Sequence, residues 1–145
     1  YGLNASITFP GDTVVYRLPN WMLVEDAADP PAYSLTVDTV AVTNGPGAGV
    51  VALTGPGTLK MTDLWFDSGA KLAVTGAVAV TGSTLTVTVA EEVPYGSTVV
   101  GDFTATDGLD LSGVTQTLVG SDGTLRYVNK LLSIGRSSGT IMLLR

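Results

Sequence analysis

Residues 34–45, SLTVDTVAVTNG, align without a gap on residues 58–69, TLKMTDLWFDSG. Leu35 then matches Leu59 and Gly45 matches Gly69, at an offset of 24 residues. Periods of about 20 to 50 residues are typical of proteins in which each repeat stacks on the next. Within both stretches apolar residues alternate with Thr, Ser or Asp, which predicts short β-strands with one buried face.

Shorter echoes recur at a 13-residue spacing, in TLKMT (58–62), KLAVT (71–75) and TLTVT (84–88). We interpret the apolar pair in each as the inward-facing residues of successive units of a parallel β-solenoid. The residues expected to share one core are Leu35, Val37, Leu59, Met61, Leu72, Val74, Leu85 and Val87. Glycines between the strands are expected at corners, where a positive φ is cheap for Gly; they are Gly55, Gly57, Gly69, Gly76 and Gly82.

The predicted fold class is therefore all-β, a parallel β-solenoid with an irregular N-terminal cap and C-terminal hairpins. The alternative is an antiparallel β-sandwich or jelly roll, because strand-plus-turn units also recur regularly there. We expect one domain with four parts: a terminal strand (1–9), an irregular cap containing Trp21 and Met22 (10–33), the repeat region (34–100) and closing strands (101–145). The closing hairpins are expected to turn at Asn129-Lys130 and around residues 136–139, followed by an apolar last strand at 141–144.

The first nine residues, YGLNASITF, alternate strictly between apolar and small or polar side chains. Pro and Gly follow at once and end the pattern, so the segment predicts one full strand. This strand has two open alternatives: it pairs inside its own subunit, or it is donated to the sheet of a neighbouring copy. Its candidate assembly residues are Tyr1, Leu3, Ala5, Ile7 and Phe9.

The composition favours an exported protein whose surface is partly covered by other subunits. Only 14% of the residues are charged and 45% are hydrophobic, whereas about a quarter of a typical globular domain is charged. The net charge of −6 argues against nucleic acid as a partner. No apolar run is long enough to form a transmembrane helix, and the absence of cysteine excludes disulfides.

The repetitive sequence pattern of residues 34–89, with GTLKM, GAKLAVTGAVAVTG and STLTVTV, resembles the β-helical passenger regions of bacterial autotransporter-type surface proteins. Gly101-Asp102-Phe103 and the Leu-rich finish are similar to the closing strands at the C-terminal end of such regions. The resemblance implies a secreted protein that is extracellular or displayed on a cell surface.

Residues capable of catalysis or metal binding are sparse, since the chain has no His and no Cys. Asp63 and Asp67 flank an aromatic pair and could form a carboxylate dyad, although acids near turns are more often structural. Three acids in Gly-containing turns, Asp107, Asp110 and Asp122, could bind calcium, but ordinary Asx-turns explain them better. We therefore expect no cofactor.

Asn4-Ala5-Ser6 is a formal glycosylation sequon, which matches by chance in many sequences. Four aromatic residues are candidates for a carbohydrate-stacking surface: Trp21, Trp65, Tyr33 and Tyr95. The function expected from the sequence is that of a non-enzymatic structural protein that self-assembles into a surface layer or filament. The alternative is a glycan-binding module or adhesin fragment, with polysaccharide as its partner.

Overall fold

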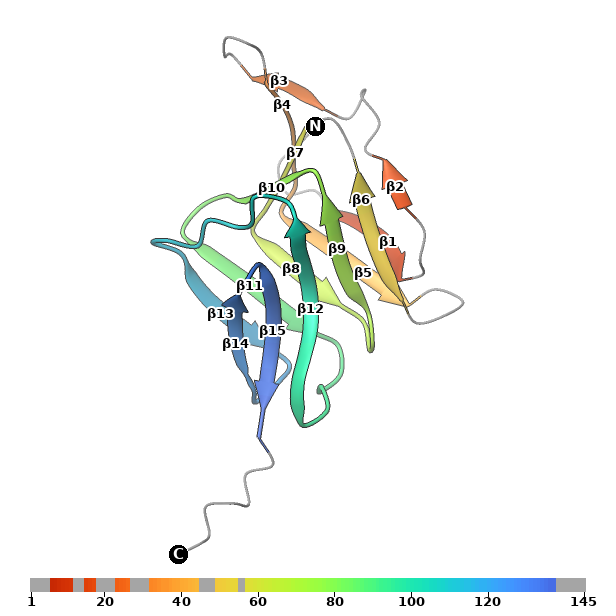
Figure 1. Cartoon of the computed structure of the whole chain (residues 1–145), viewed down its shortest axis with the longest axis vertical. Helices are drawn as coiled ribbons and strands as arrows, with labels where there is room; N and C mark the ends of the chain where they lie inside the picture. The colour runs from red at the N-terminus through yellow and green to blue at the C-terminus, as the bar shows by residue number, and fades with distance from the viewer. Residues whose placement is uncertain are drawn as a thin grey trace, which may run out of the picture.

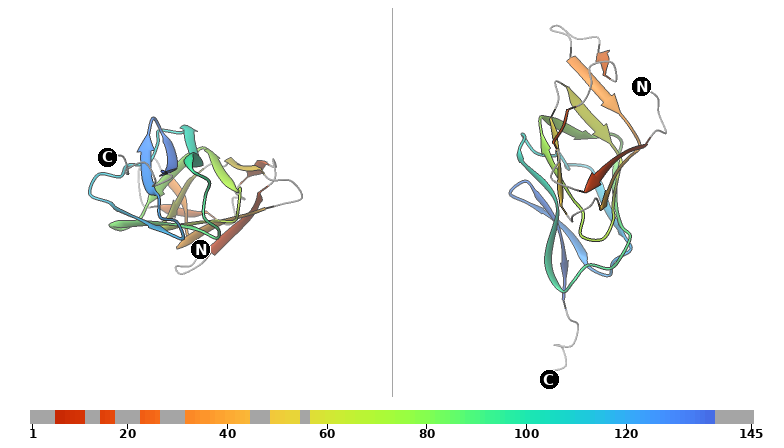
Figure 2. Two further views of the ribbon diagram at one scale, coloured as in Figure 1. Left: turned by 90° about the horizontal axis from the view of Figure 1, so that it is seen from below. Right: turned by 90° about the vertical axis from the view of Figure 1, so that its right-hand side faces the viewer.

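The computed structural model describes residues 6–11, 15–17, 23–26, 32–44, 49–54 and 57–137. In these ranges the chain is all-β, with no helix, and its strands form three sheets (Figures 1 and 2). Sheet A consists, in spatial order, of β1 (Ser6–Gly11), β5 (Thr39–Asn44), β8 (Asp63–Phe66), β11 (Thr84–Val89) and β13 (Thr115–Val119).

The other two sheets complete the body. Sheet B consists of β14 (Thr124–Val128), β15 (Leu131–Arg136), β12 (Gly96–Ala105), β9 (Lys71–Thr75), β6 (Val50–Thr54) and β2 (Val15–Arg17). Sheet C consists of β10 (Ala77–Val80), β7 (Thr58–Met61), β4 (Ala32–Thr36) and β3 (Val24–Asp26).

From β4 to β12 the chain visits the three sheets in a fixed order, and β13 then returns to sheet A without a strand in sheet C. β5, β6 and β7 lie in sheets A, B and C, and β8, β9 and β10 repeat that order. We call one circuit through the three sheets a pass. Strands of consecutive passes pair in parallel within each sheet, and the described pairings are antiparallel only at β3–β4, β12–β15 and β14–β15. An antiparallel sandwich, the alternative left open by the sequence, would not produce these parallel ladders.

The 24-residue repeat is confirmed as a stacking repeat. Leu35 pairs with Leu59 between β4 and β7, and Val40 pairs with Leu64 between β5 and β8. All eight residues predicted to share one core are buried in a single cluster, none more than 2% exposed.

The interpretation of the 13-residue echo needs correction. TLKMT forms β7 in sheet C, KLAVT forms β9 in sheet B and TLTVT lies in β11 in sheet A. These stretches therefore do not stack on one another. They resemble one another because every sheet must turn the same alternating apolar pair toward the common core.

The predicted corners are mostly in place. Gly69, Gly76 and Gly82 have φ values of 76°, 111° and 84°. Gly57 serves a different purpose, because a Cβ there would lie 2.5 Å from the carbonyl oxygen of Tyr33 on the preceding pass. Gly55 lies outside the described residues.

The flanks are more regular than expected. The segment 10–33 was predicted to be irregular, yet it contributes β2 and β3, while Trp21 and Met22 lie outside the described residues. β12 runs across the predicted boundary at residue 101. The hairpin turn at Asn129-Lys130 is confirmed, with φ values of 54° and 64°; residues 138–145, which include the second predicted turn and the last strand, lie outside the described residues.

Candidate functional site: the edges and outer face of sheet A

Sheet A is built as parallel columns of matching residues. One inward column runs through Ile7, Val40, Leu64, Val87 and Leu118, one residue from each strand. Its three central members are fully buried, whereas its end members are partly buried. The register of the sheet is therefore fixed by apolar packing, because a slip of one residue would turn the column toward solvent.

The backbone directions in sheet A follow from four hydrogen bonds between passes. Asp63 N–H donates to the Asp38 carbonyl (2.8 Å) and Asp67 N–H to the Val42 carbonyl (2.9 Å). Thr86 N–H donates to the Thr62 carbonyl (3.0 Å), and Thr115 N–H donates to the Ser83 carbonyl (2.8 Å). Residues in the outward-facing columns thus direct their N–H groups toward the preceding strand.

This hydrogen-bond pattern shows which backbone N–H groups of the two edge strands, β1 and β13, point away from the sheet. Ser6 and Thr8 occupy the same columns as Asp63 and Trp65, so their N–H groups point away from β5. Pro10 lies in the same alternation, and its missing N–H falls on the open side, where proline is tolerated. On β13 the alternate residues, Gln116 and Leu118, direct their N–H groups away from β11.

Both edges of sheet A are therefore free among the described residues. No described strand pairs with the outer side of β1 or of β13. Neither strand has a charged residue, and Ser6, Thr8, Gln116 and Thr117 have exposed side chains. Edges of this kind are templates for pairing with another chain.

The predicted assembly strand is described only in part. Tyr1, Leu3 and Ala5 lie outside the described residues, as does the sequon at Asn4. Phe9 is buried in the core, and Ile7 packs against it while β1 pairs with β5 of its own chain. Donation of the strand to another copy stays a prediction.

The candidate aromatic residues lie on different parts of the molecule. Trp65 is half-buried on the outer face of sheet A, and Tyr33 is 44% exposed on sheet C. Tyr95 precedes β12, where the Arg136 guanidinium lies 4.3 Å from the centre of its ring. The fourth candidate, Trp21, is outside the described residues.

The acids predicted near turns have local partners. Asp63 accepts a hydrogen bond from the Thr39 hydroxyl (3.4 Å), and Asp67 accepts one from Ser68 N–H (3.1 Å). Asp110 accepts from both the N–H and the hydroxyl of Ser112, an Asx-turn arrangement. These bonds lower the pKa of Asp110, the side-chain bond most of all.

Calcium ligation has no support from the described residues, which hold no cluster of three acidic groups suited to a metal ion. Asp107 is exposed, and Asp122 forms an ion pair with Arg136.

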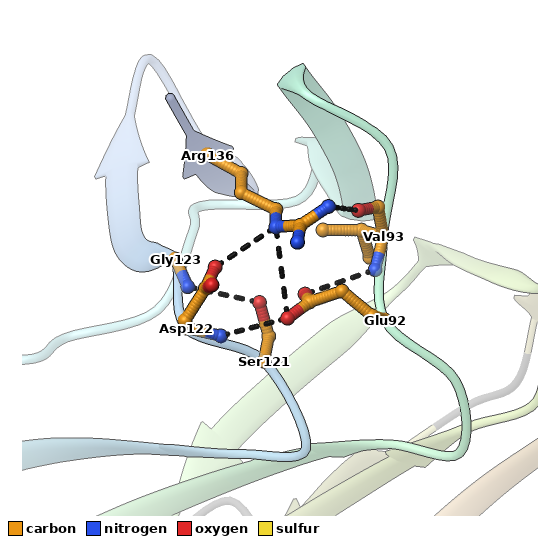
Figure 3. Close-up of polar contacts among 6 residues, drawn as sticks. All are labelled: Glu92, Val93, Ser121, Asp122, Gly123 and Arg136. Carbon is orange, nitrogen blue, oxygen red and sulfur yellow. Dashed lines mark hydrogen bonds and ion pairs between the residues drawn. The ribbon is translucent and has the colours of Figure 1, made fainter. Parts of the chain in front are cut away.

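A polar clamp that the sequence did not predict fastens the C-terminal hairpin (Figure 3). Arg136 Nε donates to Asp122 Oδ1 at 2.8 Å and lies 3.6 Å from Glu92 Oε1, while its Nη1 donates to the Val93 carbonyl at 3.0 Å. The Ser121 hydroxyl, followed by Asp122 N–H, lowers the pKa of Glu92. The hydrogen bond to Asp122 raises the pKa of Arg136. These residues are far apart in sequence, so no local motif could have revealed them.

Two depressions in the described surface lack the features of a typical small-molecule site. One has a cavity volume of about 170 Å³ and lies beside Phe66, Lys71 and Val93; this is smaller than typical ligand pockets of about 300 to 1,000 Å³. A wider one of about 550 Å³ between β10 and residues 104–108 is lined by small side chains and has no aromatic residue. The described residues also include no helix that could cross a membrane.

Comparison with protein-family models, with curated proteins and with solved structures finds no match to this chain.

Proposed function

We propose that this chain is a non-enzymatic structural subunit, built as a short parallel β-solenoid, that assembles head to tail through the two free edges of sheet A. The observation that carries the proposal is that β1 and β13 run in the same direction and leave their outward N–H groups unpaired by any described strand. The repeated passage through sheets A, B and C supports the solenoid architecture.

Addition of β1 of one copy to β13 of the next would continue the parallel ladder. The apolar column sets the register, since placing Ile7 beside Leu118 keeps the column apolar across the junction. Ser6 N–H and Thr8 N–H then donate to the carbonyls of Gln116 and Leu118, and Leu118 N–H donates to the Ser6 carbonyl. Main-chain hydrogen bonds provide affinity in such edge additions.

The junction is expected to be bent. Sheet B has one strand more than sheet A, because β15 is inserted antiparallel between β12 and β14. An extra strand occupies about 4.8 Å on one side of the body, so each copy tilts away from sheet B. A repeated head-to-tail contact then gives a ring or a helical filament.

The low charge content and the resemblance to autotransporter-type passenger regions extend the proposal to an extracellular or cell-surface location. In this proposal β1 stays in its own sheet and offers its free edge. Strand donation, in which β1 leaves β5, is the competing mode of assembly.

Two proline variants test the proposal. Thr8→Pro and Gln116→Pro each remove an N–H that points outward from one edge, and both side chains are exposed. We expect the unmodified chain to assemble with rising concentration in sedimentation velocity. Each variant alone is expected to stay at the monomer mass of 14.8 kDa.

A mixture of the two variants keeps one intact β13 edge and one intact β1 edge, so it should form a dimer and nothing larger. Val80→Pro, which removes an N–H that points outward from β10 at the edge of sheet C, is the control and should assemble like the parent chain. Assembly of either edge variant alone to the parent size would refute the proposal.

A further inference from the structure

Sheet A turns a broad hydroxyl-rich surface to solvent. The outward column through Trp65 contains Thr8, Ala41 and Thr88, and the neighbouring column through Asp63 contains Thr39 and Thr86. The buried inward residues of the three central strands, β5, β8 and β11, are apolar, so on these strands the polar side chains lie on the outer face. With strands about 4.8 Å apart, five strands give a face roughly 19 Å wide.

The charge on this face is almost absent. Among the outward residues within the five strands, Asp63 is the one ionisable side chain that the structure describes; Asp67, directly after β8, adds a second carboxylate, and no cation lies at these outward positions. Carboxylates with no basic neighbour at these outward positions repel anionic polymers such as nucleic acids and uronic-acid polysaccharides. A neutral partner rich in hydroxyl groups fits such a face better than a charged one.

Trp65 lies at the centre of the face, and its paired neighbours on either side are Ala41 and Thr88. Both side chains are much smaller than an indole, so the half-buried Trp65 side chain is larger than its paired neighbour on either side. Aromatic side chains combine a large apolar surface with a polar group, which suits partners that are apolar on one side and polar on the other. The apolar face of a sugar ring bordered by hydroxyls has this character.

Asp63 supplies the complementary polar group. It lies two residues before Trp65 on the same strand and face, hence about 6.6 Å away along the strand. Its Oδ2 accepts the Thr39 hydroxyl at 3.4 Å, which leaves capacity on the carboxylate for further donors. The hydroxyls of Thr86 and Thr88 on the adjacent strand add donors and acceptors.

We infer that the outer face of sheet A is a binding site for a neutral polysaccharide, with Trp65 as the stacking platform and Asp63 as the hydrogen-bond acceptor. The polymer lies across the strands, along the Trp65 column. This site is independent of head-to-tail assembly, because a single copy carries the whole face.

Affinity electrophoresis of the full chain tests the inference, with gels that contain glucomannan, β-1,4-xylan, β-1,3-glucan or polygalacturonate. We expect retardation by at least one neutral polymer and none by polygalacturonate. Trp65→Ala should raise the apparent Kd at least tenfold, whereas Tyr33→Ala, the exposed aromatic on sheet C, should leave it unchanged.

Asp63→Asn keeps the indole and should weaken retention by the neutral polymer several-fold, which tests the site even where Trp65→Ala fails to fold. Retention by none of the neutral polymers, or retention by polygalacturonate at equal strength, would overturn the inference. So would a Trp65→Ala variant that binds like the parent, or one whose only change is altered sedimentation, since the face would then be a contact between copies.

Discussion

Replacement of Leu72 by Ala probes the packing that holds the three sheets together. Leu72 lies in the middle of β9, is 1% exposed, and pairs with Val51 on β6 and Gly101 on β12. Loss of a buried Leu side chain costs roughly 1.5 to 3 kcal/mol in transfer free energy. The remaining cavity brings typical Leu→Ala losses to about 2 to 5 kcal/mol.

The structure places Leu72→Ala in the upper part of that range. Gly101 has no side chain that could fill the cavity, and the Phe103 ring is already pressed against it, at 2.8 Å from the place where a Cβ would stand. We therefore expect a loss of about 3 to 5 kcal/mol in the free energy of unfolding. With a urea m-value of about 2 kcal/mol/M, the midpoint falls by about 1.5 to 2.5 M.

Urea titration followed by circular dichroism measures the change. Leu131→Ala is the matched control, because Leu131 is a half-buried Leu in the same sheet, and it should cost less than about 1.5 kcal/mol. A loss below about 0.5 kcal/mol for Leu72→Ala, or equal losses for the two variants, would show that the inward register is wrong.

Two further changes act outside the core. Gly120→Ala should lower the melting temperature more than Gly82→Ala, because both have positive φ but an added Cβ at Gly120 alone meets a neighbour, the carbonyl oxygen of Val89; equal losses would contradict this. Glu92 has a lowered pKa in the folded chain, so its stabilising contribution is present above about pH 4.3 and lost as the pH falls through its folded-state pKa. The melting temperature should therefore drop between pH 6 and pH 3, and Ser121→Ala, which removes the largest cause of the shift, should reduce that drop; an unchanged pH dependence would contradict the assigned cause.

The sequence predicted the features that follow from local alternation of apolar and polar residues, namely which residues face the core. Leu35 and Leu59 stack because the 24-residue repeat matches one full passage through the three sheets. The 13-residue echo misled, because alternation shows which residues point inward but not which sheet a strand joins. KLAVT lies in sheet B because β8 stands between it and β7, and the corner between β7 and β8 is the single residue Thr62, without the glycine that marks other corners.

The candidate sites were less predictable than the core. Trp65 could be named as a candidate from the sequence because it is an aromatic residue in a Thr-rich region, but its neighbours on the face, Ala41 and Thr88, lie 24 positions before it and 23 positions after it. The clamp joins Glu92 to Arg136 across 44 positions, and its members look like ordinary turn residues in the sequence. The free edges of β1 and β13 became visible only once the pairing partners of both strands were known.

Disulfide capture tests the head-to-tail junction most directly, because the chain has no cysteine of its own. In the proposed register Thr117 faces Ser6 of the next copy at about 4.8 Å, within the Cα separation of about 4.4 to 6.8 Å that a disulfide spans. Thr8 lies one column further along, at a diagonal of about 8 Å. Thr117→Cys mixed with Ser6→Cys should yield a covalent dimer on mild oxidation, whereas Thr117→Cys mixed with Thr8→Cys, or any variant alone, should yield far less. A covalent dimer from one variant alone, or equal yields from the two mixtures, would contradict the proposed junction.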